Sequence, residues 1–149
     1  MNFELSHIPH RQVKPRLAGL TMVMDKGLSI RECENLIDGS GEYIDIIKLG
    51  FGSSMITPKL ENKLAFFREV GMPVYFGGTL FEAFVVRGQF ENYLRLLDKF
   101  KMEYAEVSDG SITMPHPEKC HYIERLSKRV TVISEVGSKE ENLLHQVKP

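Results

Sequence analysis

The sequence predicts an α/β fold in which about five parallel strands alternate with crossover helices. Short apolar runs rich in Val, Ile, Thr and Tyr begin at positions 17, 43, 72, 102 and 130, at spacings of 26, 29, 30 and 28 residues. Runs of four to eight such residues have the length of strands. Helical patterns lie between them, and a strand-helix unit that repeats in this way is typical of parallel strands.

The first helical pattern follows the strand predicted over 17–24 and covers 30–37. Ser29 stands before it as an N-cap, and Gly39 marks its end. The second strand is predicted over 43–49, and the second helix over 59–70. Thr57-Pro58 opens that helix with proline at the first helical position, and Gly71 follows its end.

The third strand is predicted over 72–76 and is followed by a long helical block over 80–100. Its second half keeps an apolar stripe at helical spacing from Tyr93 to Phe100, and Gly88 is expected to break the block in two. The fourth strand, 102–107, precedes a helix over 118–129 that Pro117 opens. The fifth strand is predicted over 130–133.

Two architectures fit such a repeat, an open doubly wound sheet or a (β/α) barrel. An open sheet concentrates its functional groups at one switch point, whereas a barrel draws them from many strand ends. Here all five predicted strands run into polar segments that contain glycine, which favours the barrel. A complete eight-unit barrel needs roughly 250 residues. We therefore expect residues 1–149 to be one domain, the N-terminal portion of a TIM-type (β/α)₈ barrel preceded by a polar arm over 1–13; a small five-stranded open domain is the alternative.

Composition excludes several classes of function. The chain has 149 residues, 42% of them hydrophobic, and a formal net charge of -1 without a basic block, so broad binding to nucleic acid is not expected. No apolar run approaches the roughly 18 residues of a membrane span. Cys33 and Cys120 are isolated thiols. They indicate a reduced protein, and we expect a cytoplasmic one without a membrane partner.

Charged side chains gather at the predicted strand ends. Because the carboxyl ends of parallel strands meet at one face, these groups are expected to share a site. The carboxylates are Asp25, Glu106, Asp109 and Glu135, with Glu82 just inside the third helix, and the lysines are Lys26, Lys48 and Lys139. Carboxylate oxygens suit a hard divalent cation, best Mg²⁺, and lysines suit anionic substrates or proton donation.

Glycines add a weaker indication. Gly50-Phe-Gly52 after the second strand and Gly77-Gly78-Thr79 after the third are each able to bring backbone N–H groups to an anion at a helix N-terminus. Neither segment completes a dinucleotide fingerprint or a Walker P-loop. Turn formation alone also explains glycine and aspartate at strand ends, and that reading stays open for each residue taken singly.

Taken together, these segments resemble the phosphosulfolactate synthase family over about residues 14–141. The similar segments, in order, are 14–16, 19–27, 43–52, 74–82, 106–110 and 134–137. The resemblance implies a (β/α)₈ barrel, commonly a homo-oligomer. It also implies the Mg²⁺-dependent addition of sulfite to phosphoenolpyruvate, which gives (2R)-phospho-3-sulfolactate on the route to coenzyme M.

The resemblance also implies roles for the strand-end residues. By the mechanism proposed for the family, sulfite attacks C3 of phosphoenolpyruvate and a lysine protonates C2. We assign that proton to Lys139. Substrate binding is expected from Lys26, Lys48, Gly77, Gly78 and Thr79, and Mg²⁺ binding from Glu106, Asp109 and Glu135.

The chain departs from the family at two places. The family usually has Gly-Lys-Lys-Asp after the fifth strand, whereas this chain has Gly137-Ser-Lys-Glu140. Only five of eight units are recognisable, so we expect catalysis to require completion of the barrel. The alternatives are a non-catalytic, barrel-derived relative (a stress-associated or interaction protein) and an unrelated small α/β domain that binds a phosphorylated metabolite.

Overall fold

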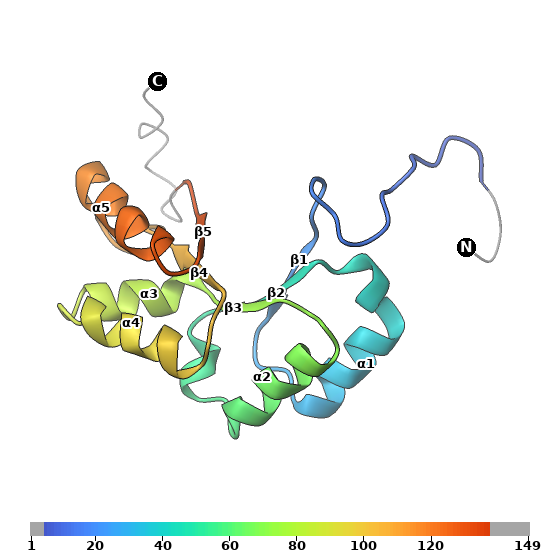
Figure 1. The fold of residues 1–149 in the computed structure, drawn as a ribbon, viewed down its shortest axis with the longest axis horizontal. Helices are drawn as coiled ribbons and strands as arrows, with labels where there is room; N and C mark the ends of the chain where they lie inside the picture. Colours follow the sequence, from blue (N-terminus) through green and yellow to red (C-terminus); the bar gives the residue numbers. More distant parts are fainter. Residues whose placement is uncertain (1–4, 138–149) are drawn as a thin grey trace.

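The computed structural model describes residues 5–137. This part of the chain alternates strands and helices as the sequence predicts (Figure 1). The strands are β1 (Met22–Asp25), β2 (Ile46–Leu49), β3 (Val74–Phe76), β4 (Tyr104–Val107) and β5 (Thr131–Ser134). The helices are α1 (Ile30–Ser40), α2 (Leu60–Glu69), α3 (Gly78–Val85), α4 (Phe90–Lys99) and α5 (His116–Ser127), with 3₁₀ turns η1 (Gly41–Tyr43) and η2 (Ser53–Met55).

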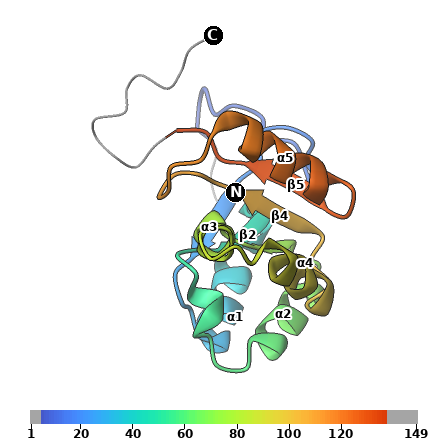
Figure 2. The same ribbon diagram turned by 90° about the vertical axis from the view of Figure 1, so that its left-hand side faces the viewer.

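Every paired strand is parallel to its neighbour. β1, β2 and β3 form one ladder in that order, with Met24 opposite Lys48 and Lys48 opposite Tyr75. β4 and β5 form a second ladder, and β3 lies against β4. The helices follow the outer side of this arc of strands (Figures 1 and 2). The expected α/β fold with parallel strands and crossover helices is confirmed, and it is consistent with a partial TIM-type barrel.

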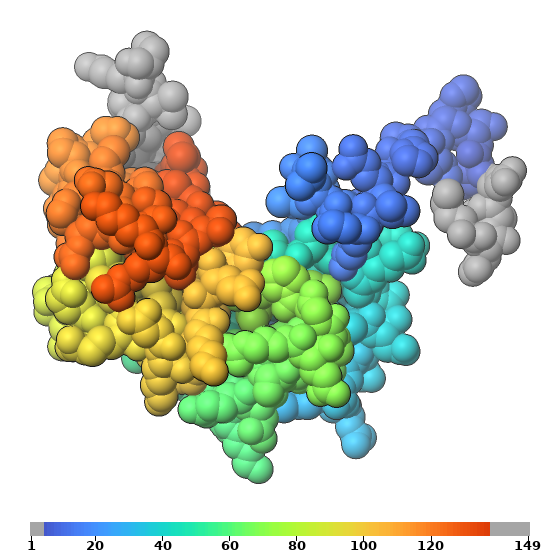
Figure 3. Space-filling model, viewed as in Figure 1, coloured from blue at the N-terminus to red at the C-terminus, as the bar shows by residue number. Residues whose placement is uncertain are grey.

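The arc is open on one side. In the described residues, β1 has only β2 as a hydrogen-bonded neighbour, and β5 has only β4. Figure 3 shows a hollow between the N-terminal segment and the region of α5 and β5. None of the helices within residues 5–137 is long and apolar enough to cross a membrane.

Several element boundaries differ from the sequence prediction. The first strand begins at Met22 instead of position 17, because Gly19 turns the chain with φ 63° and Leu17 stays 94% exposed. The second helix begins at Leu60, since Lys59 adopts a left-handed conformation with φ 51° and leaves Pro58 outside the helix. The expected break at Gly88, where φ is 64°, is confirmed.

The core lies between the strands and the helices. Cys33 of α1, Leu64 and Phe67 of α2, and Phe76 of β3 are fully buried. Further along the same outer side of the arc, the buried ring of Phe81 contacts the rings of three further residues at centroid distances of 5.4–6.3 Å: Phe90, Tyr93 and Tyr122. These contacts fix α3 against α4 and α5, and so fix the residues at the start of α3.

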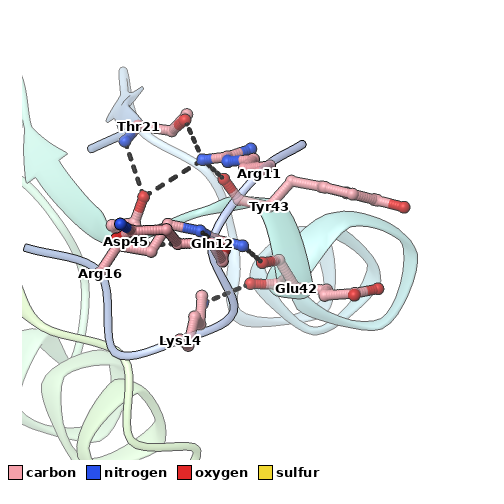
Figure 4. A network of polar contacts seen from close by, with 9 residues as sticks. Arg11, Gln12, Lys14, Arg16, Thr21, Glu42, Tyr43 and Asp45 are labelled. Atoms are coloured by element: carbon pink, nitrogen blue, oxygen red, sulfur yellow. Dashed lines mark hydrogen bonds and ion pairs between the residues drawn. The ribbon is translucent and has the colours of Figure 1, made fainter. Parts of the chain in front are cut away.

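The segment before β1 is held by Asp45, which precedes β2 (Figure 4). Arg16 Nη1 lies 2.7 Å from Asp45 Oδ1, and Arg11 Nη2 lies 3.3 Å from Oδ2. The backbone N–H of Thr21 donates to Oδ2 at 2.8 Å. This N–H and the Arg16 guanidinium outweigh burial and lower the pKa of Asp45 below its usual value of 3.8. Lys14 adds a hydrogen bond to the Gly41 carbonyl at the end of α1.

Candidate functional site

The carboxyl ends of the strands bring a lysine and a carboxylate together across β3. Lys48 Nζ of β2 lies 2.7 Å from Glu106 Oε1 of β4, and their side chains are only 11% and 4% exposed. In a barrel, alternate strands contribute side chains to the same interior layer, which is how β2 and β4 meet here. The other Glu106 oxygen accepts the backbone N–H of Gly78 at 2.7 Å. Glu106 therefore lies at the N-terminus of α3, where a negative charge is favoured.

The two glycines after β3 allow this close approach. A Cβ at Gly77 would lie 2.9 Å from Lys48 Cε, and one at Gly78 would lie 2.3 Å from Ser108 Cβ. The N–H of Gly77 donates to the carbonyl of Leu49, and that of Gly78 to Glu106. An anion that took the N–H of Gly78 would have to displace Glu106. Substrate binding by Gly77, Gly78 and Thr79 stays a prediction.

A second group of oxygens surrounds the hydroxyl of Ser108, directly after β4. Ser108 Oγ lies 2.6 Å from Glu82 Oε1 of α3 and 2.9 Å from Glu135 Oε2, directly after β5. The N–H of Gly110 donates to Ser108 Oγ at 3.2 Å. The N–H of Ser111 donates to Glu82 Oε1, also at 3.2 Å. Glu82 Oε2 is buried and has no hydrogen-bond partner in the described part of the chain.

Asp109 is bound by a lysine that the sequence analysis did not single out. Lys119 Nζ of α5 lies 2.6 Å from Asp109 Oδ1 and donates to the backbone carbonyl of Glu135 at 2.5 Å. The lysine thus joins the segments that follow β4 and β5. No short motif links a loop aspartate to a lysine ten positions later, so this pair was not predictable from the sequence.

Asp25 at the end of β1 is also paired. It is fully buried, 2.5 Å from Lys63 Nζ of α2, and Lys63 also donates to the carbonyl of Leu28. The N–H groups of Gly27 and Leu28 donate to the other oxygen of Asp25. This aspartate therefore holds the β1–α1 segment against α2, and its contacts are structural.

The predicted lysines have different surroundings. Lys26 is exposed, with Nζ 5.3 Å from the ring centre of Phe51. It lines a pocket of about 380 Å³ between the segments that follow β1 and β2, together with Ser53 and Thr57. Lys48 is paired with Glu106, as described above. Lys139 lies outside the described residues.

Tyr75 of β3 shows the electrostatic character of this interior. It is 2% exposed, and burial, together with the charges of Glu106 and Glu135, raises its pKa. The phenol therefore stays neutral at physiological pH. The negative charges that act on it come from two of the carboxylates predicted to bind Mg²⁺.

The described residues contain no cluster of three or more His, Cys, Asp or Glu side chains that is ready to hold a metal ion. Of the predicted ligands, Glu106 and Asp109 are each neutralised by a lysine. The oxygens around Ser108 fit Mg²⁺ better, because Glu82 keeps a buried oxygen without a partner. Mg²⁺ commonly uses one or two carboxylates and completes its coordination with water or substrate oxygens. The ligand roles of Glu106, Asp109 and Glu135 stay a prediction.

Comparisons with known proteins identify similar sequences. The model of the ComA family, (2R)-phospho-3-sulfolactate synthase, matches residues 9–149. The phosphosulfolactate synthase of Bacillus subtilis is 37% identical over 143 residues, which are 96% of this chain and 57% of the relative. Those of Methanocaldococcus jannaschii and Methanothermobacter thermautotrophicus are 36% and 34% identical, over 81% and 89% of this chain and 49% and 52% of the relatives. The chain thus spans about half the length of these relatives.

Proposed function

The chain belongs to the (2R)-phospho-3-sulfolactate synthase family, and on that premise we propose that it supplies part of a Mg²⁺-dependent site that adds sulfite to phosphoenolpyruvate. The observation that carries the proposal is the gathering of Lys48, Glu106 and Glu135 at the carboxyl ends of the strands, the face where barrels of this type hold their active sites. The product would be (2R)-phospho-3-sulfolactate.

In this reaction the sulfur lone pair of bisulfite forms a bond to C3 of phosphoenolpyruvate. The electron pair of the C2–C3 double bond moves toward the carboxylate and then takes a proton at C2, while the phosphate ester stays intact. Lys139 is the proposed proton donor. The net reaction consumes one bisulfite and one phosphoenolpyruvate and needs no oxidant or reductant.

The charged residues of the site are expected to have different roles in this reaction. Bound Mg²⁺ would neutralise the negative charge of the substrate carboxylate. Lys26 is exposed beside a pocket and is available for an anionic group of the substrate, such as its phosphate. Lys48 is held by Glu106, so the two charges largely offset each other and the ammonium group keeps a fixed position in the interior of the site. Glu106 and Gly78 in turn fix the start of α3.

The test is phosphorus NMR of the purified chain with Mg²⁺, phosphoenolpyruvate and sulfite. A new phosphomonoester signal that disappears when Mg²⁺ is chelated supports the proposal. Lys139→Ala should abolish this signal and leave the circular dichroism spectrum unchanged. Lys128→Ala, which removes an exposed lysine that pairs with Glu124, is the matched control and should keep the signal. Absence of product from a folded chain would favour either the non-catalytic relative or a site that needs the rest of the barrel, and repeating the assay with the missing part supplied separates the two.

We also propose that the protein is a cytoplasmic homo-oligomer. The support for association is the open edge of β1 and of β5 in the described part of the chain, since unpaired strand edges tend to be covered by a partner. Sedimentation velocity over a range of concentrations tests this. A single monomeric species at all concentrations would contradict it.

A further inference from the structure

We propose that Glu82 and Glu135, with the hydroxyl of Ser108 between them, bind the divalent cation of this site. The inference rests on the proposed Mg²⁺-dependent function and goes beyond it by naming Glu82 and the Ser108 hydroxyl as ligands, with Ser108 also in contact with both carboxylates. Neither Glu82 nor Ser108 is among the predicted ligands. The three side chains come from α3 and from the segments directly after β4 and β5, so they stand on the rigid part of the fold.

Ser108 has too few hydrogen atoms to satisfy both carboxylates. Ser108 Oγ lies within hydrogen-bond distance of one oxygen of Glu82 and one of Glu135, at 2.6 and 2.9 Å. A hydroxyl carries a single hydrogen and can donate it to only one of them. The other oxygen pair is left in close contact with no hydrogen between its members. A cation that both oxygens coordinate removes this conflict.

The negative charges of Glu82 and Glu135 are not balanced by a cationic side chain in the described residues. Within residues 5–137, neither carboxylate forms an ion pair with a lysine, arginine or histidine, whereas the neighbouring Glu106 and Asp109 each have a lysine. Glu82 is only 2% exposed, and its Oε2 has no hydrogen-bond partner in that range. A buried carboxylate without a charged partner is costly, and a cation at Oε1, the Glu82 oxygen that faces Ser108, would neutralise its negative charge.

The oxygens around Ser108 are also spaced in a way that suits a small cation. Six ligands placed 2.0–2.1 Å from Mg²⁺ in an octahedron lie about 2.9 Å from their neighbours. The distances from Ser108 Oγ to the two carboxylate oxygens, 2.6 and 2.9 Å, are close to that edge length. The N–H of Gly110 donates to Ser108 Oγ and holds it in place. Two carboxylates and one hydroxyl would leave three positions for water or substrate oxygens, the arrangement that Mg²⁺ favours.

The test is the binding of Mn²⁺, a paramagnetic substitute for Mg²⁺, to the purified chain without substrates. The loss of the electron paramagnetic resonance signal of free Mn²⁺ reports binding, and competition by Mg²⁺ shows that both ions use one site. We expect Glu82→Gln to weaken binding by at least tenfold and Ser108→Ala to weaken it by a smaller factor. Glu69→Gln removes an exposed helical carboxylate of α2 and is the matched control, expected to bind as the parent chain does.

Asp109→Asn separates the two possible ligand sets. Because Lys119 already holds Asp109, we expect this variant to keep its affinity for Mn²⁺. Loss of binding in Asp109→Asn together with normal binding in Glu82→Gln would overturn the inference, as would a folded parent chain that binds no Mn²⁺. If Glu82→Gln does not fold, Ser108→Ala carries the test, because Ser108 belongs to the proposed ligand set and not to the predicted one. A chain that binds Mn²⁺ through Glu82 but forms no product, even when the rest of the barrel is supplied, would contradict the proposed reaction and leave the cation site standing.

Discussion

The close contact between Gly78 and Ser108 predicts that Gly78→Ala destabilises the fold, although alanine normally favours a helix. The added Cβ would lie 2.3 Å from Ser108 Cβ, more than 1 Å inside the roughly 3.5 Å of an ordinary carbon contact. The start of α3 cannot retreat easily, because the N–H of Gly78 is bonded to Glu106 at 2.7 Å.

The expected magnitude follows from two opposing effects. Overpacking of a buried site costs about 3 kcal/mol at its upper range. Replacement of glycine by alanine in a helix returns up to about 1 kcal/mol. The net loss is about 2 kcal/mol, which for a domain of this size lowers the melting temperature by roughly 4–8 °C.

Thermal and urea unfolding followed by far-ultraviolet circular dichroism measure this effect. Gly39→Ala in α1 is the matched control, since a Cβ there meets nothing within 4 Å, and it should stabilise the chain by about 0.5–1 kcal/mol. Ser108→Gly removes the atom that Gly78→Ala would meet. The double variant should therefore be more stable than the sum of the two single changes predicts, by about 1–2 kcal/mol. Strict additivity, or a Gly78→Ala chain as stable as the parent, would refute the argument.

Three further predictions follow from buried or paired groups. Lys63→Met leaves the buried carboxylate of Asp25 without its cation and should lower the free energy of unfolding in urea by about 3–5 kcal/mol. A decrease below about 1 kcal/mol would show that the ion pair does not stabilise the fold. Asp45→Asn should lower stability near neutral pH. Because the folded-state pKa of Asp45 is lowered, its contribution is present above about pH 3.8 and disappears as the pH falls through the lowered value, so the parent and the variant should converge there. Thiol labelling at pH 8 should modify Cys120 and not Cys33 in the native chain, because Cys120 is exposed while burial raises the pKa of Cys33 to about 11. Urea should make Cys33 reactive as well. Rapid labelling of both thiols without urea would contradict this prediction.

The repeat of apolar runs was sufficient to predict the parallel α/β fold, because strand length and helix caps are local properties of the sequence. Boundaries that depend on tertiary contacts were not predictable. The strand expected from position 17 begins at Met22 because the preceding residues are drawn toward Asp45. Lys59 adopts a left-handed conformation that a Thr-Pro sequence does not suggest.

The same division applies to the candidate site. The sequence was sufficient to predict a candidate site at the strand ends and to place Lys48, Glu106 and Glu135 there. Their partners were not. Lys63 and Lys119 belong to helices in which a lysine usually points to solvent, yet their side chains are only 2% and 9% exposed. Ser108 looks like a turn residue in the sequence, and only the arrangement of β4, β5 and α3 shows that it contacts two carboxylates.

The attachment of the N-terminal segment to Asp45 has a consequence for synthesis of the chain. Arg16 and Arg11 are made 29 and 34 residues before the carboxylate that binds them. At about 5–20 residues per second, roughly 1.5–7 s pass before their partner exists. Because Asp45 directly precedes β2, the partner of both arginines is made after α1 and just before β2. The segment before β1 therefore waits for α1, and it can take its place at about the time when β2 pairs with β1.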